Sequence, residues 1–352
     1  MIENEHPDEQ YQKPRINLSY SVETNTAESA KRGAFWGWLV SAIEFLNSNF
    51  VTGLKILTAA IIILSYPAMV VLGHQLDDSK VELGDNRHWT VSEIGVATTL
   101  IARELDGPGW VSDKHPWHPQ SRLTALPAWQ SGVLSALSDH GRLLLDILAS
   151  ERDQDLIAAV RLLDTNEVHK TADRLLAATE AFARYDDRVA GGVTRAPNGP
   201  SALLARLDAS TVWAAREYAK LADISNPGDG WLPSQEAIAT VYTAKAVAHV
   251  TFAMLAVATE QETAILGTFA GQEQTQDMLR KWNTAARMRP LFVSNHGSDS
   301  LTGTSHPAIL ALHLDQARLA TQLLAQDLRA ALADKSDLET DSGAIAVATG
   351  PN

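Results

Sequence analysis

The chain has no cysteine among its 352 residues. Disulfide bonds and thiolate metal sites are therefore excluded. Basic residues are also scarce, because 29 Lys and Arg face 42 Asp and Glu and leave a formal net charge of −13. Nucleic-acid binding without sequence preference needs a basic surface that displaces counterions. A protein that lies on a membrane of anionic lipid also needs positive charge on its surface. The acidic balance argues against both functions.

The sequence also lacks a glycine-rich phosphate loop, a dinucleotide-binding fingerprint and an HExxH zinc motif. His115 and His118 form an HxxH in a proline-rich loop, and His249 and His313 fall within helical patterns beside apolar residues. A zinc site needs three or four ligands in suitable geometry, and no acidic residue stands at a diagnostic spacing. We interpret the HxxH as a stiff surface loop and expect the other two histidines to be satisfied core or boundary residues. We predict no metal and no cofactor.

One apolar stretch runs from residue 56 to residue 73 without a charge, and Phe50–Leu54 extends it across Lys55. A bilayer core of about 30 Å needs about 20 mostly apolar helical residues, and a lysine near the end of such a helix can reach the headgroups. A cleaved signal peptide would begin nearer the N-terminus. A buried core helix usually carries a polar stripe, whereas only Thr58 and Ser65 are polar here.

These observations predict one transmembrane helix over residues 50–73. Its orientation follows from the Lys and Arg residues near its ends, which favour the cytoplasmic side. Lys31, Arg32 and Lys55 lie on the N-terminal side, whereas the next basic residues after the span stand among acidic ones. We therefore expect a single-pass protein of a bacterial inner membrane, with its N-terminus in the cytoplasm and its main domain in the periplasm.

The segments around the span differ in composition. The first residues are polar and lack a hydrophobic period, which is typical of disorder. Trp36 and Trp38 favour the headgroup level, so we expect an interfacial helix around them, with a buried helix of the main domain as the alternative. The predicted organisation is a disordered cytoplasmic tail over 1–32, an interfacial helix over 33–48, the span over 50–73, a helical periplasmic domain over 76–335 and a disordered tail over 336–352.

After the span the hydrophobic pattern is helical, and no convincing alternating strand run occurs. Thr90–Glu93 has the form of a capping box, and Ile94, Ile101 and Leu105 then follow one helical face until Gly107. We predict an all-α fold: a single N-terminal transmembrane helix followed by a multi-helix bundle. Further helices are expected from near Pro127 and over about 155–164, 167–187, 201–224, 234–260, 262–286 and 307–333.

Two loops of the chain echo each other. Trp110–His115 reads Trp-Val-Ser-Asp-Lys-His, and Phe292–His296 reads Phe-Val-Ser-Asn-His. Each is followed by a Leu-Thr element and a long apolar-periodic helix. A duplication would give two pseudo-symmetric helical halves. Chance similarity is the alternative, because Ser and Thr are general helix caps.

The second of these loops carries a family resemblance. Arg289–Asn295, Asp299–His306 and the helix after them, together with Trp129–Leu134 and the helical segment Ala97–Ile101, resemble an uncharacterised proteobacterial membrane-protein family. That family is catalogued as domain of unknown function 2333. The resemblance covers most of the region after the span and implies an inner-membrane protein with one N-terminal span. It implies no activity and no catalytic residue.

Ser, His and Asp residues gather in the same loop, where Asp299, Ser300, Ser305 and His306 lie close in sequence. A serine nucleophile needs a base within hydrogen-bond reach and a third group that orients the base, but no sharp strand–turn–helix elbow surrounds a serine here. Ser305 can equally cap the helix that begins at Pro307. We assign no catalytic residue. A binding surface is the more open hypothesis, with the candidates Trp117, His118, Phe292, Asn295, Asp299 and His306.

The sequence therefore favours a membrane-anchored envelope protein that binds or scaffolds another component. A hydrolase or other enzyme acting on cell-wall or lipid substrates is the alternative, and a sensor with a cytoplasmic tail is a third hypothesis. The expected partners are the lipid bilayer and another envelope protein. A homo-oligomer is left open, and nucleic acid is not expected.

Overall fold

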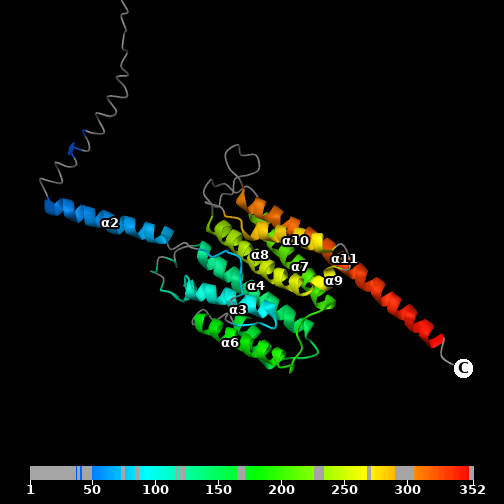
Figure 1. Ribbon diagram of the computed structural model, residues 1–352. Helices are drawn as coiled ribbons and strands as arrows, with labels where there is room; N and C mark the ends of the chain where they lie inside the picture. Colours follow the sequence, from blue (N-terminus) through cyan, green and yellow to red (C-terminus); the bar gives the residue numbers. More distant parts are fainter. Residues whose placement is uncertain are drawn as a thin grey trace, which may run out of the picture. The chain divides into compact units, whose positions relative to one another are not determined.

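The computed structural model describes residues 37, 40–41, 50–72, 76–83, 87–115, 118, 120, 124–164, 171–225, 234–267, 271–289 and 305–348. Regular structure in these residues is helical throughout, with no strand, which confirms the predicted all-α fold (Figure 1). The elements are α2 (Phe50–Leu72), α3 (Ser92–Asp106), the 3-10 helix η1 (Val111–Asp113), α4 (Ala125–Ile147), α5 (Gln154–Asp164), α6 (Thr171–Ala190), α7 (Pro200–Ile224), α8 (Gln235–Gln261), α9 (Thr263–Leu266), α10 (Gly271–Ala286) and α11 (His306–Ala348).

The chain divides into two compact units, residues 1–66 and 67–352, and α2 begins in the first. The large apolar side chains of α2 that are described are exposed on every side of the helix; Ile63, for example, is 69% exposed. The hydroxyl of Thr58 donates to the carbonyl of Leu54 at 2.8 Å, and that of Ser65 donates to the carbonyl of Ile62 at 2.9 Å. The two polar side chains are therefore satisfied within the helix itself.

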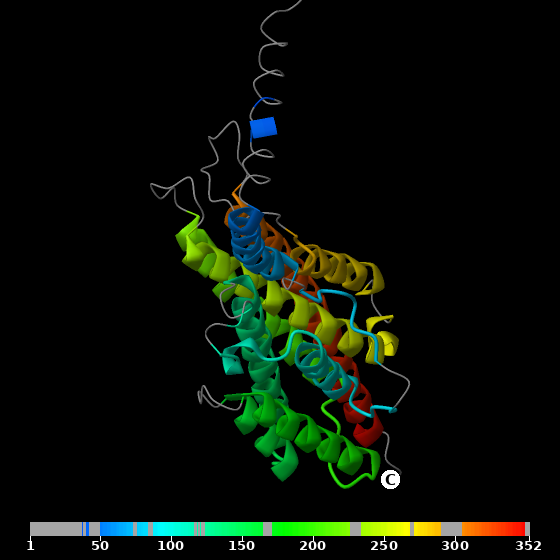
Figure 2. The same ribbon diagram turned by 90° about the vertical axis from the view of Figure 1, so that its left-hand side faces the viewer.

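Two apolar clusters build the second unit, and α8 lies between them (Figures 1 and 2). The first core joins α3, α4, α5 and α6 to one side of α8, and its largest buried side chain is Trp129. The second core joins α7, α10 and α11 to the other side of α8 around Trp282. The central helix is apolar on both sides because it faces two cores.

Helix α8 is also the one helix of the described residues that is long and apolar enough to cross a membrane. Its most apolar window is 78% buried inside the bundle, which is the environment of a core helix rather than of a lipid-facing one. The apolar stretch of α2 with described side chains, Thr52–Ser65, is shorter.

The capping box expected at the start of α3 does not form. Val91 is the N-cap residue and makes no side-chain cap. Instead, Asp186 of α6 accepts hydrogen bonds from the backbone N–H groups of Val91, at 2.8 Å, and Thr90, at 3.3 Å. Glu93 cannot complete a box because it pairs with Arg206 of α7. A neighbouring helix thus supplies the acceptor that the sequence pattern assigned to the helix itself.

Other boundaries also shift. The helix predicted over 262–286 is two helices, α9 and α10, and α9 ends before Gly267. Helix α11 continues to Ala348, so residues 336–348 are helical where the sequence predicts a disordered tail; this stretch contains Leu, Glu and Ala, which favour helix, and no proline.

Of the predicted interfacial helix 33–48, only Gly37, Val40 and Ser41 are described, and each is helical. The predicted tail 1–32 lies outside the described residues.

The two predicted halves do not pack alike. Helix α10 lies along α11, whereas α3 packs chiefly against α6 and touches α4 only slightly. The loop at Trp110 forms η1, and its counterpart at Phe292 lies outside the described residues. The described contacts therefore give no support to a pseudo-twofold relation between the halves.

Helices α4 and α8 approach each other closely at Gly132. A Cβ atom at this position would lie 2.7 Å from the carbonyl oxygen of Thr243 and 2.7 Å from the Cβ of Ala246. Gly132→Ala gains about 1 kcal/mol of helix propensity, but the backbone oxygen cannot yield without moving α8. We expect a net loss of about 1–2 kcal/mol in the free energy of unfolding, measured by denaturant titration.

Ser131→Ala, an exposed position one residue earlier on α4, is the matched control and should leave stability nearly unchanged. An unaltered or increased stability of Gly132→Ala would show that α4 and α8 can separate without cost.

Candidate functional site

The predicted binding residues fall mainly outside the described part of the chain, which omits Trp117, Phe292, Asn295 and Asp299. His118 is exposed, and its Nδ1 accepts from the backbone N–H of Gln120 at 3.3 Å.

His306 is the first residue of α11. The hydroxyl of Ser305 accepts from the backbone N–H of Ala308 at 3.4 Å, which is the capping role that the sequence offered as the alternative to catalysis. Within the described ranges, no group of three or more His, Cys, Asp or Glu residues could hold a metal ion.

A buried polar cluster instead lies where the segment after α2 meets the bundle. We name it the junction cluster; it comprises Asp78, Glu104, Trp129, Lys245, His249 and Arg289. The carboxylate of Asp78 accepts from the Lys245 ammonium at 2.8 Å and from Nε of Arg289 at 3.0 Å. The side chains of Asp78 and Lys245 are only 1% and 3% exposed, whereas Arg289 is largely exposed. The pair is thus buried, with one cation reaching it from the surface.

Trp129 contacts three other members of the junction cluster. Its ring lies 5.5 Å from the Lys245 ammonium and 5.5 Å from the His249 ring. Its indole N–H donates to Oε1 of Glu104 at 2.7 Å, and Nε2 of Gln130 donates to Oε2 of Glu104 at 3.0 Å. The cluster therefore connects α3, α4 and α8 through charge-assisted and aromatic contacts.

Burial and neighbouring charges set the protonation states in this cluster. Burial opposes the charge on Asp78, but hydrogen bonds from Arg289 and Lys245 outweigh it and lower the pKa of Asp78 to about 2. Burial raises the pKa of Glu104 and lowers the pKa of Lys245. Burial also lowers the pKa of His249 to about 4, and its Nε2 is buried without a hydrogen-bond partner. At neutral pH the imidazole of His249 is uncharged.

The backbone next to Asp78 is fastened to the bundle as well. Arg103 of α3 donates to the carbonyl oxygens of Ser79, at 3.2 Å, and Lys80, at 2.8 Å. Leu76 packs against both apolar cores, and further apolar residues of the same segment pack against the first. The chain that leaves α2 is thus held by ionic, hydrogen-bond and apolar contacts within ten residues of the end of that helix.

A second buried ion pair crosses between the two cores. Arg206 of α7 donates to Glu93 of α3 through Nε at 2.6 Å and Nη2 at 2.5 Å. The same Nη2 donates to the carbonyl of Pro197 at 2.5 Å. The bidentate geometry leaves both groups paired in a buried position.

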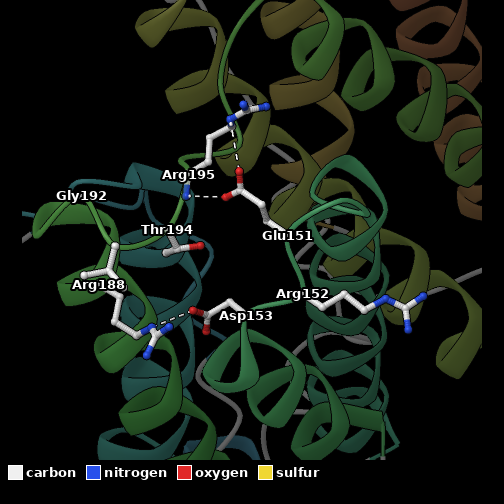
Figure 3. A pocket seen from close by; sticks show the side chains of 8 residues that line it. Glu151, Arg152, Asp153, Arg188, Gly192, Thr194 and Arg195 are labelled. Carbon is white, nitrogen blue, oxygen red and sulfur yellow. Dashed lines mark hydrogen bonds and ion pairs between the residues drawn. The ribbon is translucent and has the colours of Figure 1, made fainter.

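The loops after α4 and α6 border an open hollow of about 460 Å³, whose side chains Figure 3 shows. Asp153 accepts from Nε of Arg188 at 2.8 Å, and Glu151 accepts from the backbone N–H of Arg195 at 3.1 Å. Figure 3 shows the side chains of Arg152, Arg188 and Arg195 pointing in different directions. Because these cations do not converge on one point, the hollow is poorly suited to hold a single anion.

Sequence reasoning missed most of the junction cluster. It singled out His249, which is indeed buried, but its Nε2 is unsatisfied rather than paired. The usable signal was Lys245, a lone charge inside the apolar stretch of α8 and four residues before His249. Its partner Asp78 lies 167 residues away in sequence, so periodicity could not identify it.

Comparison with models of known protein families, with curated proteins and with solved structures finds no match to this chain. The interpretation of these sites therefore depends on their own geometry.

The Asp78–Lys245 pair gives a direct test of the junction cluster. Asp78→Ala leaves the buried ammonium of Lys245 without its carboxylate, and breaking a buried pair in this way costs about 3–5 kcal/mol. We expect a loss of that order in the free energy of unfolding, measured by denaturant titration of the full chain. Adding Lys245→Met to Asp78→Ala removes the stranded charge and should restore much of the loss.

Asp77→Ala, at the exposed neighbouring position, is the control. A loss no larger for Asp78→Ala than for Asp77→Ala would mean that the ion pair does not hold the segment.

The buried histidines predict a pH dependence of stability. In the folded chain the pKa of His249 is about 4 and that of His140, which packs 4.4 Å from the Trp213 ring, is about 3, both lowered chiefly by burial from 6.5. The unfolded chain takes up these protons first as the pH falls. The stability that neutral burial contributes is therefore complete above pH 6.5. It is lost as the pH falls from 6.5 to about 4 for His249 and to about 3 for His140, at about 1.4 kcal/mol per pH unit for each histidine.

His249→Gln should remove one of these two contributions to the slope between about pH 6 and about pH 4.5. The measurement is the free energy of unfolding at a series of pH values, with the exposed His88→Gln as the control variant. An identical slope in His249→Gln and the wild type would contradict the assignment.

Proposed function

We propose that this chain is a membrane-anchored envelope protein, held by α2 in the lipid bilayer, whose helical bundle binds or scaffolds another component. The observation that carries the proposal is the surface of α2, whose described apolar side chains are exposed on all sides and whose hydroxyls are satisfied within the helix. In water such a surface is unfavourable by about 25 cal/mol for each Å² of apolar area. In hydrocarbon it needs no protein partner.

The fastening at Asp78 supports the same proposal. The segment that follows a membrane helix connects it to the soluble bundle. Here residues 76–83 are held against the bundle by the Asp78 ion pairs and the Arg103 hydrogen bonds. The charge bias across the span favours a cytoplasmic N-terminus and a periplasmic bundle in an inner membrane.

The polar chemistry of the bundle favours binding over catalysis. In the junction cluster, Asp78 and Lys245 pair with each other, and Glu104 accepts a hydrogen bond from Trp129. All three residues are buried. Glu93 and Arg206 are likewise paired inside the bundle. A scaffold requires such groups only to fix its shape. The resemblance to the family catalogued as domain of unknown function 2333 belongs to the same proposal, because it implies a single N-terminal span.

Extraction of membranes with carbonate tests the anchor. The wild-type chain should remain in the pellet after ultracentrifugation. Ile61→Arg combined with Leu64→Arg places two charges at the centre of α2, where each costs about 2.5–3.5 kcal/mol on insertion scales, and should move much of the chain to the supernatant. Protease added to spheroplasts should cleave the bundle from outside.

Leu176→Arg combined with Val193→Arg is the matched control, because both positions are exposed apolar residues of the bundle, and this variant should stay in the pellet. A wild-type chain found in the supernatant would overturn the anchor and the envelope assignment with it.

A further inference from the structure

Exposed large apolar side chains of the bundle gather on two adjacent helices. In the described residues of the second unit they number seven, of which five lie on α7 or α11; the five are Val212, Tyr218, Leu312, Leu319 and Leu323. Leu176 of α6 and Val193 of a loop are the two others. A concentration of this kind on one surface is typical of a contact with another protein.

Helices α7 and α11 present this surface together. They pack side by side, and Arg329 of α11 forms an ion pair with Asp208 of α7. One side of α11 buries Leu310, Leu314 and Leu324 in the second core, and the opposite side carries the exposed leucines. We name this surface the α7–α11 face, and it comprises Val212, Ala215, Ala219, Leu312, Leu319 and Leu323.

The spacing of the exposed leucines fits a helix as the occupant of this face. Leu312, Leu319 and Leu323 follow at intervals of seven and four residues, and both intervals occur between the apolar positions of a heptad seam between helices. Ala215 and Ala219 of α7 are exposed small residues one turn apart, which permits close approach of a second helix. A lipid surface or an extended peptide would not require this period.

The size of the face is close to what a stable dimer needs. Helix α7 has 25 residues, so it is about 37 Å long at 1.5 Å per residue. Two helices about 10 Å wide then offer about 700 Å². Stable interfaces bury about 800 Å² on each partner. A small foreign peptide would leave much of this area uncovered.

The charges on the α7–α11 face favour a second copy of this chain over a foreign protein as its partner. The chain carries a net charge of −13 and would attract basic proteins over most of its surface. On this face, however, the charges cancel locally, because Asp208 pairs with Arg329 and Asp315 pairs with Arg318. A basic partner gains nothing from a neutral face, and a second acidic copy is not repelled by it.

We propose that the α7–α11 face is the contact between two copies of this chain. A two-fold axis through the face brings each helix pair against its equivalent and forms a four-helix arrangement with an apolar interior. The proposal does not depend on the position of α2 in a bilayer, because detergent solution reveals self-association in either case.

The full-length chain in detergent solution tests it by light scattering. The wild type should have a protein mass of twice 38.1 kDa at micromolar concentration. Leu319→Glu combined with Leu323→Glu buries charges at the contact and should raise the dissociation constant about 100-fold or more. Leu176→Glu combined with Val193→Glu, at two exposed apolar positions outside the face, should remain dimeric. Circular dichroism should show the same helix content in all three chains.

Cross-linking tests the location of the contact independently of mass. Because the chain has no cysteine, Leu312→Cys and Leu176→Cys each introduce a single thiol, at positions 54% and 53% exposed. A short bismaleimide should join Leu312→Cys chains into dimers and leave Leu176→Cys chains as monomers. A monomeric wild type, a dimer that survives the double glutamate variant, or equal cross-linking at both positions would overturn the proposal.

Discussion

The buried ion pair between Asp78 and Lys245 is the constraint on which the architecture depends most. Helix α8 lies between two apolar cores and is otherwise almost free of charge. The ammonium of Lys245 therefore needs a partner of opposite charge inside the bundle. The only carboxylate that contacts it among the described residues comes from the segment after α2. The position of one lysine on the central helix thus determines where the chain enters the bundle.

A second ion pair extends this logic to the packing of the two cores. Apolar attraction is non-directional, so burial alone does not select one register for two clusters that share a helix. Glu93 and Arg206 favour one register, because the bidentate contact joins α3 of the first core to α7 of the second. Buried pairs of this kind add little net stability but penalise alternative arrangements. Gly132 and Thr243 add a steric limit on α4 and α8.

The sequence predicted what depends on local periodicity and missed what depends on distant partners. Helices α5, α7 and α8 begin and end within one residue of the expected bounds, because their apolar faces repeat at helical spacing. The capping box at α3 failed because Asp186, 95 residues away, replaces it. The junction cluster was missed for the same reason: a lone lysine in an apolar helix signals a buried partner, but nothing in the pattern of Asp78 identifies that partner. Four of the six candidate binding residues lie outside the described ranges, and these remain predictions.

The proposed membrane anchor and the proposed dimer would reinforce each other physically. A helix in a bilayer confines the bundle to a thin layer, and confinement raises the effective concentration of copies toward one another. A face of about 700 Å² per copy, at the lower end of stable interfaces, would then be occupied at a lower total amount of protein than in free solution. A dimer of membrane-held bundles in turn presents every remaining surface twice, which raises the avidity of a scaffold for a multivalent partner without any new contact.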